Sequence, residues 1–317
     1  MTSIKKLLDK INSYSNINII DAISFDEINY DSSKYLINKF HNECYNSRFS
    51  NNDIFIYIKR CTNVTKISSN LCNINIYLYS NNNYNSIFKL IKIYRRLYIL
   101  SKIYNITKEI NFHIALCKLK RYFPKKNEIF ESKHFNGGFT NILNNDIYII
   151  RSCEYAKVMI HEFLHHVNII NDILLFMSYN EINKLKSFFR ISNNTDFEPN
   201  EGNIEFWATI YNLLFISVEY NINFKLLYNK ELAFSYMQYN KIIKKYNNNI
   251  WYEKTNIFAY FILKLILLKN YKKYLKIPLP YNSSEISNFF INNYNSIKKN
   301  NIKDRNNNLN AMLFSQY

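Results

Sequence analysis

The spacing of apolar and polar positions divides the chain into a part with alternating strands and a part that is helical throughout. Residues 73–79 alternate as a half-buried strand does, and residues 112–116 and 146–151 repeat the pattern. Apolar side chains three and four positions apart predict a helix over residues 87–104. Another helix is predicted between Ser152, a suitable cap, and about Asn171. After it the pattern is helical only, at about residues 180–190, 200–218, 224–245, 255–275 and 283–293.

This order of elements predicts an α+β fold with a small mixed sheet followed by a helical lobe. We expect residues 1–72 to form an N-terminal segment of uncertain role and residues 73–172 to form the sheet-containing lobe. Residues 173–294 then form the helical lobe. Residues 295–317 are predicted to be a flexible tail, because their first part is rich in Asn, Lys and Arg.

Composition narrows the class of protein. The 317 residues are 48% hydrophobic, enough for a large core, and only 3 Gly and 4 Pro exclude collagen-like and linker-rich chains. The net charge of +17 would suit a nucleic-acid partner, but the lysines are spread evenly along the chain. An evenly charged surface indicates solvation, so a nucleic-acid partner is not favoured.

The cysteines and the apolar segments indicate the cellular compartment in which the protein is expected. The five cysteines form no C-x-x-C pair, which argues against a disulfide framework and a cysteine-based zinc site. The first twenty residues lack the apolar stretch of a signal peptide. The most apolar run, Ile257–Leu268, has only twelve residues and contains Lys264, so it predicts a core helix and no membrane span. We expect an intracellular protein that is not secreted.

The predicted helix after Ser152 contains an H-E-x-x-H motif, His161-Glu162-Phe163-Leu164-His165. Positions i and i+4 lie on one face of a helix, so the two imidazoles can bind one metal ion. Glu162 is then close enough to act on a water molecule held by that ion. The alternative is a helix that buries histidines against core polar groups, but a glutamate buried between them would need a partner.

A catalytic zinc site takes three protein ligands and leaves one position open. Asn168 and Asn171 stand where the metzincin extension requires Gly and His, which excludes that class. A gluzincin takes its third ligand from a glutamate on a second helix. Glu201 fits this place, and Glu205 one turn later fits an acceptor for the free N–H of a ligating imidazole. The alternative is a solvated acidic first turn stabilised by the helix dipole.

Together these motifs resemble the zinc metallopeptidases encoded by nucleocytoplasmic large DNA viruses. The resemblance covers about residues 110–215 and implies a zincin-like fold, a Zn²⁺ cofactor and a peptide or protein substrate. A viral origin would place the protein in the host cytoplasm or the virion. The matched residues are Asn136, Gly138, Thr140, Arg151, Glu154, Tyr155, Lys157, Val158, His161, Glu162, His165, Glu201, Glu205, Phe206, Trp207 and Ala208.

Weaker candidates surround this core. Asn136, Gly137 and Gly138 could form an edge strand that pairs with substrate, or a simple loop. Arg151 could bind substrate or pair with Glu154. A tyrosine or histidine should stabilise the oxyanion, but among 28 tyrosines the sequence does not indicate which residue does so.

The function predicted is peptide hydrolysis with Glu162 as general base. The alternative is an inactive zinc scaffold that binds nucleic acid or protein through its basic surface, although such a scaffold would not need Glu162.

Overall fold

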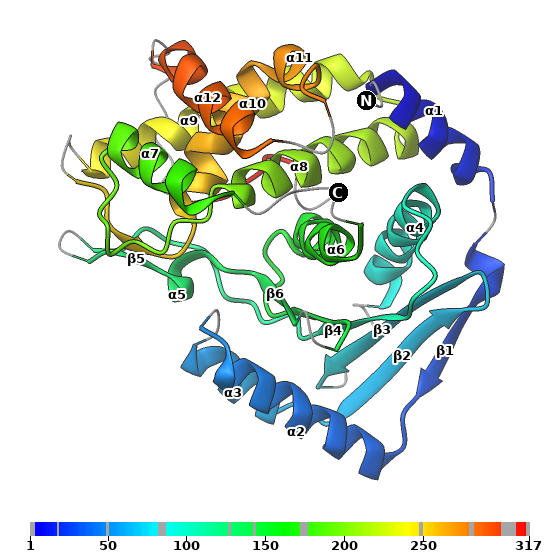
Figure 1. Cartoon of the computed structure of the whole chain (residues 1–317). Helices are drawn as coiled ribbons and strands as arrows, with labels where there is room; N and C mark the ends of the chain where they lie inside the picture. The colour runs from blue at the N-terminus through cyan, green and yellow to red at the C-terminus, as the bar shows by residue number, and fades with distance from the viewer. Residues whose placement is uncertain are drawn as a thin grey trace.

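The computed structural model describes residues 4–17, 19–48, 51–81, 87–125, 128–141, 144–171, 177–246, 250–278, 282–298 and 309–314. A mixed sheet of six strands has helices on both faces (Figure 1), so the expected α+β class is confirmed. The strands run across the sheet in the order β1-β2-β3-β4-β7-β6. Their bounds are β1 (Ile23–Glu27), β2 (Asn63–Ser69), β3 (Cys72–Ser80), β4 (Ile110–Ile114), β6 (Gly138–Asn141) and β7 (Asp146–Ile149).

The sheet combines two kinds of pairing. β3, β4 and β7 are parallel to one another, and the crossover between β3 and β4 contains helix α4 (Ile87–Ile103). β1, β2 and β3 pair antiparallel, as do β6 and β7. Among the described strands of this sheet β6 pairs with β7 alone and therefore forms one edge.

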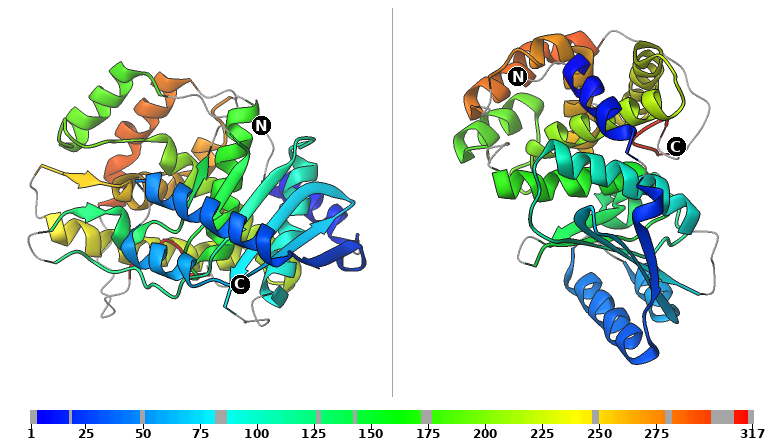
Figure 2. Two further views of the ribbon diagram at one scale, coloured as in Figure 1. Left: turned by 90° about the horizontal axis from the view of Figure 1, so that it is seen from below. Right: turned by 90° about the vertical axis from the view of Figure 1, so that its right-hand side faces the viewer.

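Alternation along the strands separates two apolar layers. Ile74, Ile76 and Leu78 of β3 face the main core, whereas Tyr79 faces a smaller cluster on the other side. That smaller cluster is covered by α2 (Tyr30–Asn46) and α3 (Asn52–Lys59). In the right-hand view of Figure 2, α2 lies on one side of the sheet and α1 (Ile4–Ser15) lies on the other, among the remaining helices.

The helices of the second half pack against the main core. α6 (Tyr155–Asn171) lies between the sheet and α8 (Asn200–Glu219), as Figure 1 shows. The expected core helix over Ile257–Leu268 is buried along its whole length, but it begins as a π-helix, η3 (Phe258–Leu263). The other helical elements are η1 (Ile20–Ala22), α5 (Ser132–Phe135), α7 (Tyr179–Phe189), α9 (Phe224–Tyr246), α10 (Lys264–Lys269), α11 (Tyr271–Tyr274), α12 (Ser283–Asn293) and η4 (Tyr294–Ile297).

Some expectations about the organisation need correction. β1 and β2 belong to the same sheet as β3, so the sheet continues across residue 72. The second half is not purely helical, because β8 (Glu253–Lys254) pairs with β5 (Phe130–Glu131). Ser152 does not cap α6; its hydroxyl donates to the carbonyl of Cys117.

The predicted flexible tail, residues 295–317, is wrong for residues 295–297, which lie in η4 with Ile297 1% exposed, and for residues 309–314. Leu309, Ala311 and Met312 are at most 1% exposed, and the backbone around them bonds to buried charged side chains. Residues 299–308 and 315–317 of the predicted tail lie outside the described residues.

No helix in the described part of the chain is long and apolar enough to cross a membrane.

Candidate metal centre

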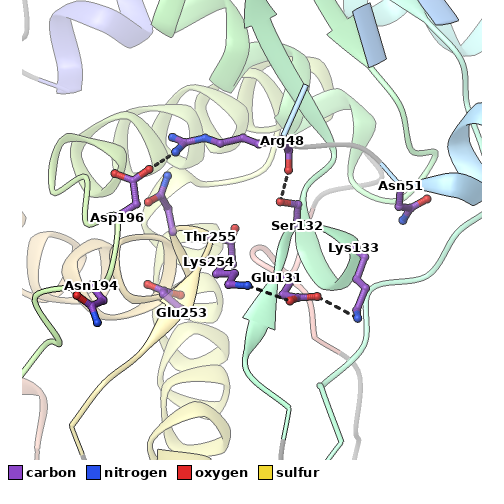
Figure 3. A pocket seen from close by; sticks show the side chains of 11 residues that line it. Arg48, Asn51, Glu131, Ser132, Lys133, Asn194, Asp196, Glu253, Lys254 and Thr255 are labelled. Carbon is purple, nitrogen blue, oxygen red and sulfur yellow. Dashed lines mark hydrogen bonds and ion pairs between the residues drawn. The ribbon is translucent and has the colours of Figure 1, made fainter. Parts of the chain in front are cut away.

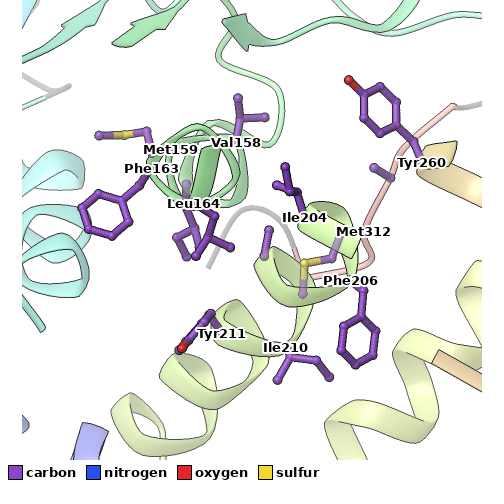
Figure 4. Packing of buried hydrophobic residues seen from close by; sticks show 14 of the residues in the cluster. Val158, Met159, Phe163, Leu164, Ile204, Phe206, Ile210, Tyr211, Tyr260 and Met312 are labelled. Carbon is purple, nitrogen blue, oxygen red and sulfur yellow. The ribbon is translucent and has the colours of Figure 1, made fainter. Parts of the chain in front are cut away.

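Helices α6 and α8 pack directly against each other and carry the residues of the two sequence motifs. Leu164 of α6 and Ile204 of α8 are at most 4% exposed. Figure 4 shows these two side chains where α6 and α8 meet, and Phe163 on the side of α6 turned away from α8. Burying one such side chain stabilises the fold by about 1.5–3 kcal/mol, so the helix pair is a rigid base for a site.

The structure brings His161, His165 and Glu201 together. Their ligand atoms all lie within 4.8 Å of one another. The Nε2 atoms of the two histidines are 3.1 Å apart. The Glu201 carboxylate lies 3.3 Å from His161 Nε2 through one oxygen and 3.2 Å from His165 Nε2 through the other.

These separations suit a small cation with tetrahedral coordination. Ligand atoms placed tetrahedrally about 2.0–2.2 Å from zinc would be about 3.3–3.6 Å apart, close to the separations observed. In addition, Glu201 Oε2 is buried, and although it lies 3.3 Å from His161 Nε2 it accepts no hydrogen bond of good geometry from a described residue. A buried carboxylate oxygen without a donor is costly, and a cation would satisfy it. Two imidazoles and one carboxylate also match the donor set of catalytic zinc sites.

The carboxylates around His161 and His165 also favour positive charge at the candidate metal centre. Burial disfavours the charged form of His161, but pairing with the carboxylates of Glu201 and Glu205 outweighs burial and raises its pKa to about 9. The pKa of His165 is raised against burial by the charge of Glu201. The same carboxylates that attract protons to the imidazoles would attract a metal cation in their place.

Glu205 supports His161 from behind. Its Oε2 atom accepts a hydrogen bond of 2.8 Å from His161 Nδ1. A carboxylate only accepts, so Nδ1 carries the proton and Nε2 is directed at the cluster. The other oxygen, Oε1, pairs with the ammonium of Lys157. Burial would raise the pKa of Glu205, but Lys157 and His161 outweigh it and hold the pKa well below its usual range.

Glu162 is held by the edge strand. The Thr140 hydroxyl donates to Glu162 Oε2 at 2.9 Å. In β6, Gly138 and Thr140 face α6. The alternate residues face the other side of the sheet, where Phe139 packs in the smaller apolar cluster and Asn141 bonds to Glu43 of α2. The alternation of the strand therefore directs the one hydroxyl of β6 to the predicted general base.

Two glycines permit the close packing on which the site depends. A Cβ atom on Gly138 would lie 2.7 Å from the carbonyl oxygen of Tyr148 and 3.0 Å from Val158, so only glycine lets β6 approach both β7 and α6 this closely. A Cβ atom on Gly202 would lie 2.7 Å from Cβ of Leu263. Gly202 thus allows the first turn of α8, which carries Glu201, to contact the π-helix η3.

That contact places Tyr260, which the sequence did not single out, beside the cluster. Its ring centroid lies 5.8 Å from that of His161. Its hydroxyl bonds to no other described residue, and Figure 4 shows it directed away from the apolar side chains of α6 and α8. Burial and the charges of Glu201 and Glu162 raise its pKa well above the usual value, so the phenol keeps its proton and can donate. A π-helical turn near a functional site is a recurrent signal, but it is visible only in three dimensions.

The structure removes Arg151 from the candidate substrate residues. Its side chain is about 1% exposed and donates to the backbone carbonyls of Lys120 and Lys133. It does not pair with Glu154, whose carboxylate is taken by Arg121. Arg151 therefore holds two loops together and does not face the cluster.

Asn136, Gly137 and Gly138 lie at the start of the edge strand. Asn136 is 6% exposed, and its side-chain oxygen accepts from Thr255 at 2.8 Å. The carbonyl of Gly137 accepts from the backbone of Ile150, and β6 begins at Gly138. Only Gly138 therefore belongs to the edge strand, where packing requires glycine, whereas Asn136 ends α5 and Gly137 links it to the strand.

A cavity of about 470 Å³ lies beyond Asn136, between the sheet-containing half and the helical half. Figure 3 shows Arg48 reaching across it to Asp196. Thr255 on its wall bonds to Asn136, and Asn256 bonds to Glu198, three residues before Glu201. Two hydrogen bonds therefore connect the wall of the cavity to the residues that precede β6 and α8.

Comparisons with models of protein families, with curated proteins and with solved structures found no match.

Proposed function

We propose that this chain is a zinc-dependent peptidase with a zincin-like site. The observation that carries the proposal is the convergence of His161, His165 and Glu201 at separations that suit a tetrahedral cation. Glu162 on the same helix adds an acid–base group that a purely structural metal site would not require. The resemblance of the motifs to viral zinc metallopeptidases agrees with this assignment.

Each side chain then has a separate task. His161, His165 and Glu201 would hold zinc, which supplies Lewis acidity toward water and a substrate carbonyl. Glu162, oriented by Thr140, takes a proton from the attacking water and passes it to the leaving amine. Tyr260 donates a hydrogen bond to the oxygen on which negative charge develops. Glu205 keeps His161 in the tautomer that directs Nε2 at the metal.

The substrate would lie along β6. An extended peptide can add to the free edge of a strand through backbone hydrogen bonds. β6 is an edge strand, and its residue Thr140 contacts Glu162, so a peptide paired with β6 would pass the general base.

Three glutamine substitutions test the assignment. Glu201→Gln should abolish zinc binding, because a charged ligand is replaced by a neutral amide. Glu205→Gln should retain zinc with about 10–100-fold weaker affinity. Glu162→Gln should retain zinc and fold but lose turnover.

Two measurements test these expectations. Plasma mass spectrometry gives the zinc content of each protein, and a peptide-library digest read by mass spectrometry gives its peptidase activity. We expect about one zinc ion per wild-type chain. A wild-type chain that contains no zinc after purification in metal-replete buffer contradicts the proposal. Salt-dependent DNA binding that Glu162→Gln leaves unchanged, without cleavage of any peptide, would favour the scaffold alternative.

A further inference from the structure

Residues 309–314 occupy a buried groove of the helical half. Leu309 is fully buried, and Ala311 and Met312 are 1% exposed. The groove is formed by Glu154, just before α6, together with α8, α9 and α10, so the segment contacts α8 and the residue that leads into α6.

The groove recognises the backbone of this segment with charged side chains from three elements. Glu154, just before α6, accepts from the backbone N–H of Met312 at 3.0 Å. Glu231 of α9 accepts from the N–H of Leu313 at 2.9 Å, and Lys264 of α10 donates to the carbonyl of Ala311. All three side chains are at most 1% exposed. Buried charges require hydrogen-bonding partners, and here the partners are supplied by the peptide backbone.

The segment is also tied to the helix that supports the metal centre. Asn212 of α8 donates to the backbone carbonyl of Phe314 at 3.1 Å, and the same helix carries Glu205, which accepts from His161. The backbone carbonyl of Glu154 accepts from Val158 in the first turn of α6, two turns before His165. Removing residues 309–314 would leave Glu154, Glu231 and Lys264 without these partners, next to the groups that orient His161.

We propose that residues 309–314 are an internal peptide ligand, that their groove binds the same peptide in trans, and that occupation of the groove sets the metal affinity of the site. The metal readout rests on the proposed function, whereas peptide binding and its effect on stability do not. A free peptide with this backbone arrangement and small or flexible apolar side chains is therefore a predicted ligand of the chain.

The experiment cuts the chain after it has folded, so that it does not depend on the folding of a truncated protein. A protease site is placed between residues 298 and 309 of the full chain, and the folded protein is cut. A fluorescent synthetic peptide of residues 309–317 is then offered to the cut protein. Two matched peptides carry a methyl group on one backbone nitrogen, either that of Met312 or that of Asn310, which donates to no described residue.

We expect the labelled peptide to exchange into cut protein and not into uncut protein, whose groove is occupied. Methylation at Met312 should weaken binding at least about tenfold, because a hydrogen bond to a buried carboxylate is lost, whereas methylation at Asn310 should weaken it less. Emptying the groove by dialysis should lower the melting temperature of metal-free protein and reduce zinc affinity about tenfold or more, and added peptide should restore both.

Failure of the two proposals can be distinguished. No exchange of the labelled peptide, equal binding of the two methylated peptides, or an emptied protein with unchanged melting temperature and zinc affinity overturns the inference. An uncut chain that binds no zinc overturns the proposed function, while peptide exchange and the melting temperature of metal-free protein still decide the groove.

Discussion

The buried pair of Lys157 and Glu205 gives a quantitative test of how the metal centre is supported. Lys157 is 2% exposed and Glu205 is 1% exposed, so neither charge can be solvated by water when its partner is lost. Breaking a buried ion pair by removing one partner costs about 3–5 kcal/mol. Lys157→Met and Glu205→Gln should each lower the unfolding free energy by about this amount. The double variant removes both charges, and a coupling of about 2–3 kcal/mol should limit its loss to about 3–8 kcal/mol.

The assay is urea unfolding of metal-free wild-type and variant proteins, which excludes stabilisation by bound zinc. The pair of Lys184 and Glu181 on α7, 3.3 Å apart with side chains 41% and 18% exposed, provides the more solvated control. Lys184→Met and Glu181→Gln should show a coupling of only about 0.3–0.5 kcal/mol. If the coupling of Lys157 and Glu205 is no larger than that of the control pair, Lys157 does not support Glu205 and the account of the site is wrong.

Further expectations concern the neighbours of the cluster. Tyr260→Phe should lower kcat on a cleaved peptide about a hundred- to a thousand-fold while zinc content stays unchanged; an unchanged kcat would exclude Tyr260 as the oxyanion donor. Gly202→Ala should destabilise the fold by about 1–3 kcal/mol, measurable by thermal unfolding, because its Cβ atom has no room against η3. Burial opposes ionisation of Asp146, but pairing with His113 and Lys39 lowers its pKa to about 2. The ionised carboxylate of Asp146 therefore stabilises the fold above pH about 3.8, and this contribution is lost as the pH falls through about 2. The melting temperature of the wild type should include this loss over that range, whereas that of Asp146→Asn should not.

The sequence predicted the regular part of the fold and missed the strands that lack alternation. The strands β3, β4 and β7 lie inside the sheet and are mostly buried, and their apolar residues are frequent enough to be recognised as strands, although both faces are covered rather than one. In β1 only Ile23 is partly buried, and in β2 the buried residues are Val64 and Ile67, three positions apart, followed by a register shift. A period of two is absent from both, so hydrophobic pattern alone could not have placed them.

The candidate site shows the same division between local and tertiary signals. His161, Glu162 and His165 are spaced by one helix and could be predicted from that helix alone. The choice of Tyr260 depends on a contact between α8 and η3 that no spacing encodes. Glu154 lies three residues from Arg151, but it adopts φ 60° ahead of α6 and pairs with Arg121 instead.

The groove for residues 309–314 has a consequence for synthesis on the ribosome. Glu154, Glu231 and Lys264 emerge before the backbone groups that pair with them, so for part of translation these charges have no partner from residues 311–313. N-terminal elements generally fold first as a chain is made. The sheet and its outer helices can therefore form early, whereas the helical half, and with it the arrangement around His161, is expected to close only after the last of these residues has been added. A chain stalled before residue 309 should accordingly be bound by chaperones and degraded faster than the finished protein.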